Sequence, residues 1–163
     1  MRTIKFRGKK TSNGVWVYGS LVYLDENGAA IYVQTDNGSA KVMDLVYVHP
    51  DTVCQFTGFL DKNGKEIYEG DVLRSDEYPY SYGEKERDNY YAVVYYCEEG
   101  ACFGTVTVKN PNSSVSGISD GILDDVEREK MKSFEVIGNV HEEKWQQYGE
   151  YFKTEEGKEA DND

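Results

Sequence analysis

The chain has 163 residues, 13% of them aromatic, and it carries 18 basic and 30 acidic side chains, which give a formal net charge of -12. A chain of this length fits one domain with at most a small addition, and it buries a core large enough to need no disulfide bonds. The acidic excess disfavours general binding of nucleic acid, and no window approaches the roughly 18 apolar residues of a membrane-spanning helix.

The acidic excess lies in the second half of the sequence. Residues 1–74 hold 9 basic and 9 acidic side chains, whereas residues 75–163 hold 9 basic and 21 acidic ones. The simplest interpretation is an acidic, solvated surface that keeps the protein soluble. The basic residues near the N-terminus are not followed by the apolar segment of a signal peptide, so we expect a cytoplasmic protein.

The first half is predicted to be a series of short antiparallel strands. Ile4 and Phe6 alternate with Lys5 and Arg7, which is typical of a strand with one buried face. Gly19 interrupts a longer apolar run and predicts a bend there. Turn signals rich in Asp, Asn, Gly and Pro separate the further strands, which we place at residues 15–24, 30–34, 41–48 and 53–57.

The segment Asp61-Lys62-Asn63-Gly64 is the strongest turn signal in the chain. Asn-Gly between two β-prone runs predicts a hairpin with a type I′ turn, because both central residues of that turn need positive φ. Further on, Glu69-Gly70-Asp71 places a glycine where a strand bends sharply, and we expect Asp71 to accept hydrogen bonds from the amides of that turn. We interpret both features as parts of the scaffold.

The second half combines strands with long loops. Residues 75–89 are charged and aromatic without a period, and we expect a long exposed loop that carries Tyr78, Tyr80 and Tyr82. Loops of that length are often functional or disordered.

A hairpin and a closing strand follow this loop. Residues 90–97 and 102–108 are predicted to pair around Glu99-Gly100, so that Cys97 and Cys102 face each other. With three cysteines in all, reduced thiols in contact without a bond are the simplest interpretation. The remaining expected elements are a flexible loop at 110–121, a strand over about 134–140, a helix at 142–152 with Trp145, Tyr148 and Phe152 on one stripe, and a frayed tail at 153–163.

These elements predict a mainly β protein: a small SH3-like or partly open antiparallel β-barrel with an additional β-hairpin and a short C-terminal helix. We place the N-terminal barrel core at residues 1–74. A second β-rich part, packed on the first, covers residues 75–152 and contains the long loops, the closing strand and the helix. Residues 153–163 form an acidic tail.

The sequence contains no pattern that indicates catalysis or a cofactor. It has no nucleophile elbow, P-loop or dinucleotide-binding glycine motif. His49 and His141 are too few and too far apart in sequence for an ordinary zinc site. Asp61-x-Asn63 is similar to the start of a calcium loop, but its glycine stands at the fourth position instead of the sixth. We therefore expect no enzymatic activity, no cofactor and no bound metal.

Five blocks of sequence occur in order between about residues 2 and 145. They are IKFRGK at 4–9, GVWVYG at 14–19, VCQFTG at 53–58, DKNGKEIYEGDV at 61–72 and EVIGNV at 135–140. This combination resembles the YopX family, small proteins of bacteriophages and prophages. The resemblance implies a mostly β protein with a barrel-like core and no established enzymatic role, and it carries over no catalytic residue. Cys54, where the family favours glycine, and residues 141–143, where it favours Asn-Pro-Glu, depart from the pattern.

The leading hypothesis is a phage-derived accessory protein that contacts another, unidentified protein or a second copy of itself. The contact would use strand edges or the loop with Tyr78, Tyr80 and Tyr82, since exposed tyrosines bring contact area at small entropic cost. The same tyrosines could instead cover a hydrophobic edge of their own sheet.

The alternative hypothesis is a small barrel that binds nucleic acid. A variant reverses the charge relationship, so that the acidic second half imitates DNA and occupies a DNA-binding protein. A third hypothesis is a small enzyme whose site is assembled only by the fold, and the sequence offers no residues for it. The stacking groove of the nucleic-acid hypothesis would combine the cationic N-terminal strand with nearby aromatic rings, namely Arg2, Lys5, Arg7, Trp16, Tyr18 and Tyr23.

Overall fold

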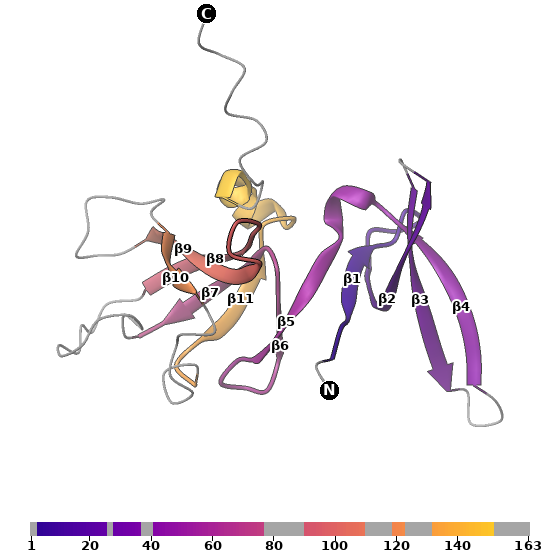
Figure 1. Cartoon of the computed structure of the whole chain (residues 1–163), viewed down its shortest axis with the longest axis horizontal. Coiled ribbons are helices and arrows are strands. Elements are labelled where there is room, and N and C mark those ends of the chain that lie inside the picture. The colour runs from indigo at the N-terminus through magenta and orange to yellow at the C-terminus, as the bar shows by residue number, and fades with distance from the viewer. Residues whose placement is uncertain are drawn as a thin grey trace, which may run out of the picture. The chain divides into compact units, whose positions relative to one another are not determined.

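The computed structural model describes residues 3–25, 28–36, 41–76, 90–109, 119–122 and 132–151. Strands in this part of the chain form two sheets (Figure 1), and the strand pairs of known register are antiparallel. The predicted mainly β class is therefore confirmed. Within the described ranges, no helix is long and apolar enough to cross a membrane.

The chain divides into two compact units, which we call unit 1 (Met1–Gly58) and unit 2 (Phe59–Asp163). It passes from one to the other within strand β5 (Cys54–Leu60), at Gly58, whose φ of 95° favours glycine. The division after residue 74 that the sequence suggests stays a prediction, because compactness alone does not show which segment folds as a domain.

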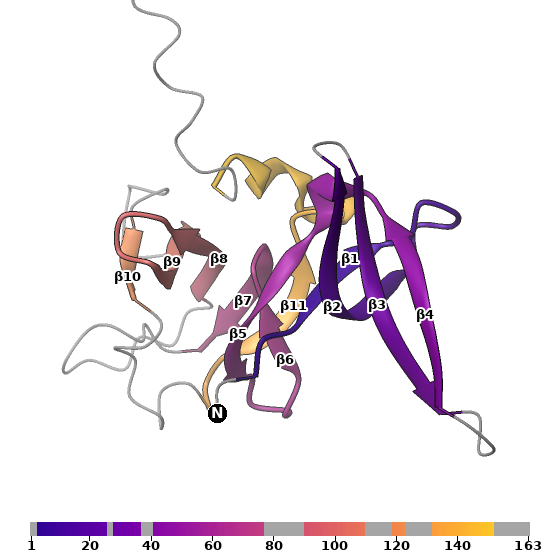
Figure 2. The same cartoon turned by 45° about the vertical axis from the view of Figure 1, so that its right-hand side comes forward.

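Unit 1 is a sheet of neighbouring antiparallel strands in the order β4-β3-β2-β1-β5. Figure 2 shows β2, β3 and β4 side by side as its long strands. A 3-10 turn, η1 (Pro50–Thr52), precedes β5. The strands that belong wholly to this unit are β1 (Phe6–Lys9), β2 (Trp16–Asp25), β3 (Gly28–Asp36) and β4 (Lys41–Val48).

Strand β2 changes its pairing partner at Gly19. Residues up to Gly19 pair with β1, and residues from Ser20 onward pair with β3. A Cβ at Gly19 would collide with the backbone oxygen of Tyr32, so a larger residue cannot occupy this position without a shift of the strands. The bend predicted from the interrupted apolar run therefore coincides with the point where β2 turns from one neighbour to the next.

The end of β4 meets the end of β1 at one corner of unit 1. An isolated bridge joins Lys10 to Val48, and the backbone N–H of His49 donates to the oxygen of Lys9 at 2.9 Å. The N–H of Thr11 donates to the oxygen of Tyr47 at 3.1 Å. The described strands nevertheless form no closed barrel.

Alternate side chains of the unit 1 strands form its core. Val17, Ala29, Ile31 and Val48 are buried together, and strand register places Leu21 opposite Ile31. Because successive side chains of a strand point to opposite faces, the residues between these positions lie on the other side of the sheet. The partly buried side chains that pack on this core are Phe6, Leu21, Val33, Val46 and Val53.

Unit 2 holds the second sheet, with strand order β10-β9-β8-β7-β11. The short strand β6 (Glu66–Tyr68) is the neighbour of β5 in the first sheet. The five strands are β7 (Asp71–Ser75), β8 (Tyr90–Cys97), β9 (Cys102–Lys109), β10 (Ser119–Ile122) and β11 (Glu135–Asn139).

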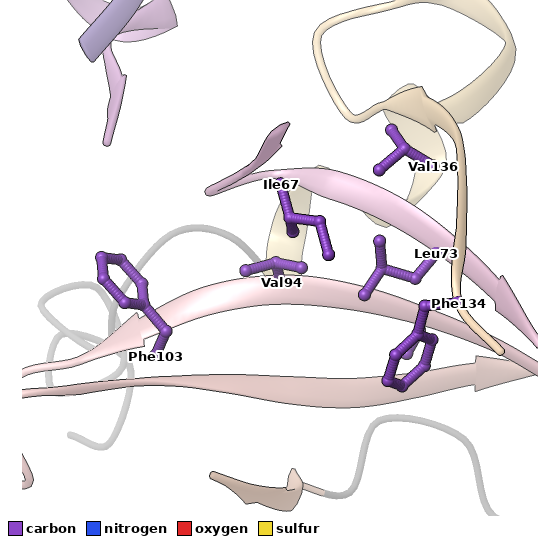
Figure 3. Close-up of a cluster of buried hydrophobic side chains, with 7 residues drawn as sticks. Ile67, Leu73, Val94, Phe103, Phe134 and Val136 are labelled. Carbon is purple, nitrogen blue, oxygen red and sulfur yellow. The ribbon is translucent and has the colours of Figure 1, made fainter. Parts of the chain in front are cut away.

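The core of unit 2 consists of two hydrophobic clusters. In the first, side chains of β6, β7, β8, β9 and β11 are buried together with Phe134, the residue before β11. Figure 3 shows Ile67 and Val94 pointing toward each other, and Phe134 is among the largest fully buried side chains. In the second, Trp145 packs against Val72, Val93 and Val140. Trp145 belongs to a 3-10 helix, η3 (Glu143–Tyr151), which occupies most of the segment where the sequence predicts a short helix.

The turn at Asp61 to Gly64 differs from the predicted type I′ turn. The N–H of Gly64 donates to the oxygen of Asp61 at 2.9 Å, and Gly64 has a φ of 79°. Asn63 does not share this positive φ, so only one of the two residues is left-handed. The reason is the side chain of Asp61, which accepts the N–H of Asn63 at 2.8 Å and that of Lys65 at 2.9 Å and thereby fixes a different turn.

Candidate interaction face

The sheet face of unit 1 that lies opposite its core carries a group of aromatic, aliphatic and basic side chains, which we call the outer face. Register places Lys9 opposite Trp16, Arg7 opposite Tyr18, and Tyr32 opposite Leu45. Nine residues form the outer face, namely Lys5, Arg7, Lys9, Trp16, Tyr18, Tyr32, Met43, Leu45 and Tyr47.

The aliphatic and aromatic part of the outer face is exposed to solvent. Five of its side chains have exposed fractions between 38% and 62%, with Met43 and Tyr47 at the upper end. The Tyr32 hydroxyl donates a hydrogen bond to the sulfur of Met43, which ties neighbouring strands together on this side. Single exposed apolar side chains are ordinary, but Tyr32, Met43, Leu45 and Tyr47 are neighbours on the paired strands β3 and β4.

Basic side chains lie over the aromatic rings at one end of the outer face. The guanidinium carbon of Arg7 lies 4.6 Å from the centre of the Trp16 ring, and Lys9 Nζ lies 5.4 Å from the same ring. Lys5 Nζ lies 5.6 Å from the Tyr18 ring. These distances are those of cation–π interactions, which hold the rings and the positive charges together.

Arg7 differs from the two lysines in its burial. Only 4% of its surface is exposed, whereas Lys5 and Lys9 are partly exposed. The planar guanidinium stacks on Trp16 and is weakly hydrated, so it tolerates burial better than an ammonium group does. Arg7 therefore supports the sheet, and Lys5 and Lys9 are the cations that a ligand could reach.

The structure brings together four of the six residues expected for a nucleic-acid groove, namely Lys5, Arg7, Trp16 and Tyr18. Tyr23 pairs with the core residue Ala29, so it lies on the opposite side of the sheet from Trp16 and Tyr18, and it is 73% exposed. The other predicted site residues, Arg2, Tyr78, Tyr80 and Tyr82, lie outside the described residues.

Sequence reasoning missed the contribution of β3 and β4 to the outer face. Met43, Leu45 and Tyr47 alternate with residues that are also mostly apolar, so the strand shows no polar face. The one indication was the spacing of these three residues at every second position, which places them on one side. Which side is exposed depends on register with β3, and register is not visible in a single sequence.

Two turns of unit 2 are held by buried carboxylates, those of Asp61 and Asp71. Asp61 accepts the N–H of Val136 at 3.1 Å in addition to its turn hydrogen bonds. Asp71 accepts the N–H of Tyr68 at 2.8 Å and the side-chain amide of Asn139 at 3.2 Å. These bonds use the carboxylates as acceptors for the protein itself, which agrees with their interpretation as scaffold.

Asn139 extends this network to the end of β11. Its side-chain amide also donates to the backbone oxygen of Glu69 at 3.3 Å, and its side-chain oxygen accepts the N–H of His141 at 2.9 Å. No group of three or more His, Cys, Asp or Glu side chains in the described part of the chain is arranged to hold a metal ion.

An ion-pair cluster on the surface of unit 2 joins the hairpin turn to β11. Glu135 Oε2 lies 2.7 Å from Lys62 Nζ and 3.3 Å from Arg74 Nη2. The hydrogen bond and charge of Lys62, with the charge of Arg74, lower the pKa of Glu135 below its usual value. The arrangement supports the same turn as Asp61 does.

Comparison with known proteins identifies a family and similar solved structures. Residues 5–144 match the model of the YopX protein family. The crystal structure of protein EF1440 from Enterococcus faecalis is similar over 86% of this chain and 95% of that chain, with 19% sequence identity and a TM-score of 0.47. No curated protein matches the chain.

Proposed function

The chain belongs to the YopX family, and from that premise we propose that it is a phage- or prophage-derived accessory protein that binds another protein and catalyses no reaction. The binding surface is the outer face of unit 1. The observation that carries this proposal is the exposure of Tyr18, Tyr32, Met43, Leu45 and Tyr47 on one side of three neighbouring strands.

The side chains of the outer face indicate which kind of surface the partner presents. Tyrosine and methionine are enriched at interfaces because they bring large contact areas and adapt to irregular surfaces. Lys5 and Lys9 stand beside the rings, so the matching surface has an apolar centre and a carboxylate at its rim. A second copy of the chain also meets this description, because residues 59–163 hold 25 acidic and 12 basic side chains.

The proposal also covers the type of barrel that unit 1 forms and the cellular location of the protein. Unit 1 is a partly open, SH3-like barrel, a description supported by the bridge that joins Lys10, after β1, to Val48 at the end of β4. The protein acts in the cytoplasm of a bacterial host, which is where the proteins of a phage or prophage are made.

Capture of partners with matched variants tests the proposal. Wild-type protein and the variants Tyr47→Ser, Met43→Ser and Tyr23→Ser are immobilised, exposed to host lysate, and the bound proteins are quantified by mass spectrometry. Tyr23 is the matched control because it is an exposed tyrosine on the opposite side of the same sheet.

The expected result is one protein that wild type and Tyr23→Ser retain and that Tyr47→Ser and Met43→Ser lose. Its direct binding is then measured with both proteins purified. Light scattering on the chain alone distinguishes self-association from a different partner. Equal retention by all variants, or binding that follows Tyr23, would contradict the assignment of the outer face.

Binding of single-stranded nucleic acid is the second candidate function, and the position of the accessible cations Lys5 and Lys9 over the rings of Tyr18 and Trp16 favours it. Proteins that bind single strands combine cations along the backbone path with rings on which bases stack. The net charge of -12 opposes it. In a variant of this hypothesis, the acidic second half imitates DNA and occupies a DNA-binding protein. Competition between this chain and DNA for one host protein would test that variant.

An electrophoretic mobility-shift assay with a single-stranded oligonucleotide tests whether the outer face binds nucleic acid. Binding on the outer face predicts a shift at low salt that weakens steeply as salt is added, because each phosphate contact releases counterions. Lys5→Gln and Tyr18→Ser should reduce the shift, and Lys65→Gln in unit 2 is the matched charge control. The absence of a shift at low salt removes this candidate.

A further inference from the structure

The hairpin of β8 and β9 ends in two cysteines that stand directly opposite each other. Cys97 and Cys102 are the last pair of the ladder, and the loop between them is closed by the N–H of Ala101, which donates to the oxygen of Glu98 at 3.2 Å. Directly opposed residues on antiparallel strands have Cα atoms about 4.5 to 5.5 Å apart. Disulfides join Cα atoms about 4.4 to 6.8 Å apart, so the backbone already has the required separation.

The two sulfur atoms also converge on one point. A Cβ placed on Gly100 would lie 2.9 Å from Cys102 Sγ and 3.5 Å from Cys97 Sγ. Neither cysteine is in a disulfide bond, and both are partly exposed, so a small reagent can reach them. The third thiol, Cys54, is fully buried and donates to the oxygen of Thr52 at 3.3 Å.

We propose that Cys97 and Cys102 form a dithiol site that a low-molecular-weight disulfide, such as glutathione disulfide, converts reversibly into a disulfide within the hairpin. The site goes beyond the proposed function, because it lies in unit 2 and uses no residue of the outer face. Formation of this disulfide can therefore be tested independently of partner binding.

The reaction proceeds by two thiol–disulfide exchanges. One cysteine loses its proton, attacks a sulfur of glutathione disulfide and forms a mixed disulfide, while the released glutathione thiolate takes up a proton. The second protein cysteine then attacks the sulfur of the first protein cysteine in the mixed disulfide. The second glutathione is released as a thiol. The two protein thiols lose two electrons and two protons in total, and glutathione disulfide gains them.

Thiol trapping on the full-length protein tests the site. The protein is incubated with glutathione disulfide, the remaining thiols are blocked with N-ethylmaleimide, and the products are identified by intact mass and peptide mapping. The expected product has lost two hydrogen atoms, contains a Cys97–Cys102 bond, and takes up one maleimide at Cys54 only after denaturation. Stable glutathione adducts on both cysteines, a bond between two chains, or unchanged thiols would each overturn the proposal.

Two variants test the convergence of the sulfur atoms. Cys102→Ser should leave Cys97 as a persistent glutathione adduct, because no second thiol is present to displace glutathione. Gly100→Ala places a methyl group against Cys102 Sγ and should slow ring closure, so that the mixed disulfide accumulates. Unchanged closure in Gly100→Ala, with a circular dichroism spectrum equal to that of wild type, would contradict the proposed geometry.

Discussion

The carboxylate of Asp61 accepts the backbone N–H of Val136 at 3.1 Å, although 75 residues separate the two. The same carboxylate organises its own turn through the N–H groups of Asn63 and Lys65. Asp61 is only 6% exposed, so its charge is stabilised by these donors in place of water. One side chain thus fixes the hairpin turn and docks β11 against it.

Replacement of Asp61 by alanine is expected to lower the free energy of unfolding by about 3 kcal/mol. The N–H groups of Asn63, Lys65 and Val136 lose a charged acceptor, and those that are buried are left without a hydrogen-bond partner. Urea unfolding followed by circular dichroism measures this change. Asp44→Ala is the control, since Asp44 is an exposed carboxylate on a strand. Equal stability of the two variants would show that Asp61 does not hold the turn.

Turn chemistry made much of unit 2 predictable from sequence. Asn63-Gly64 indicated the hairpin, and Gly70 with Asp71 indicated the sharp corner, because few residues satisfy the backbone demands of such turns. Gly70 has a φ of 70°, and Asp71 accepts the N–H of Tyr68 as expected. The sequence could not show that Asp61 bonds to Val136, since that contact depends on how distant strands meet.

The outer face was less predictable for a related reason. The alternation of Ile4 and Phe6 with Lys5 and Arg7 predicted one buried face, with Arg7 on the other. Register places Arg7 opposite Tyr18, and it stacks on Trp16, where it is buried as well. Met43 and Tyr47 looked no different from the core residue Val48 in hydrophobicity. Period-two alternation separates two faces of a strand, but it does not say which face is covered.

Gly138 should tolerate no side chain, because a Cβ there would collide with the indole nitrogen of Trp145. Gly138→Ala is expected to displace Trp145 and to lower the free energy of unfolding by about 1 to 3 kcal/mol, the usual cost of overpacking. Fluorescence in a Trp16→Phe background reports Trp145 alone and should shift to longer wavelength. Gly149→Ala is the control, since a Cβ at Gly149 meets nothing within 4 Å; an unshifted spectrum in Gly138→Ala would refute the contact.

Stability should depend on the ionisation of Glu135. Its pKa is lowered from a usual value near 4.5, mainly by the hydrogen bond from Lys62. A depressed folded-state pKa stabilises the protein fully above the unfolded-state pKa, and this contribution is lost as the pH falls through the folded-state value. The stability difference between wild type and Glu135→Gln should therefore be constant above about pH 5 and shrink in more acidic solution.

Lys62→Met provides the check on that assignment. Without its main partner, Glu135 should have a pKa closer to the usual value, and the pH-dependent part of the difference should become smaller. Because both groups are partly exposed, added salt should reduce the effect as well. A pH dependence that is equal with and without Lys62 would assign it to another carboxylate.

Arg7→Lys is expected to be damaging although it conserves the charge. Lysine cannot reproduce the planar stacking on Trp16 at 4.6 Å, and a buried ammonium group loses more hydration than a guanidinium does. The free energy of unfolding should fall by about 1 to 2 kcal/mol, the range of a desolvated cation–π contact. The reverse exchange, Lys5→Arg, keeps a cation over the Tyr18 ring at a partly exposed position and should change stability by less than about 0.5 kcal/mol. Urea unfolding of both variants decides the point: if Arg7→Lys is as stable as Lys5→Arg, the stacking of Arg7 on Trp16 does not stabilise the sheet.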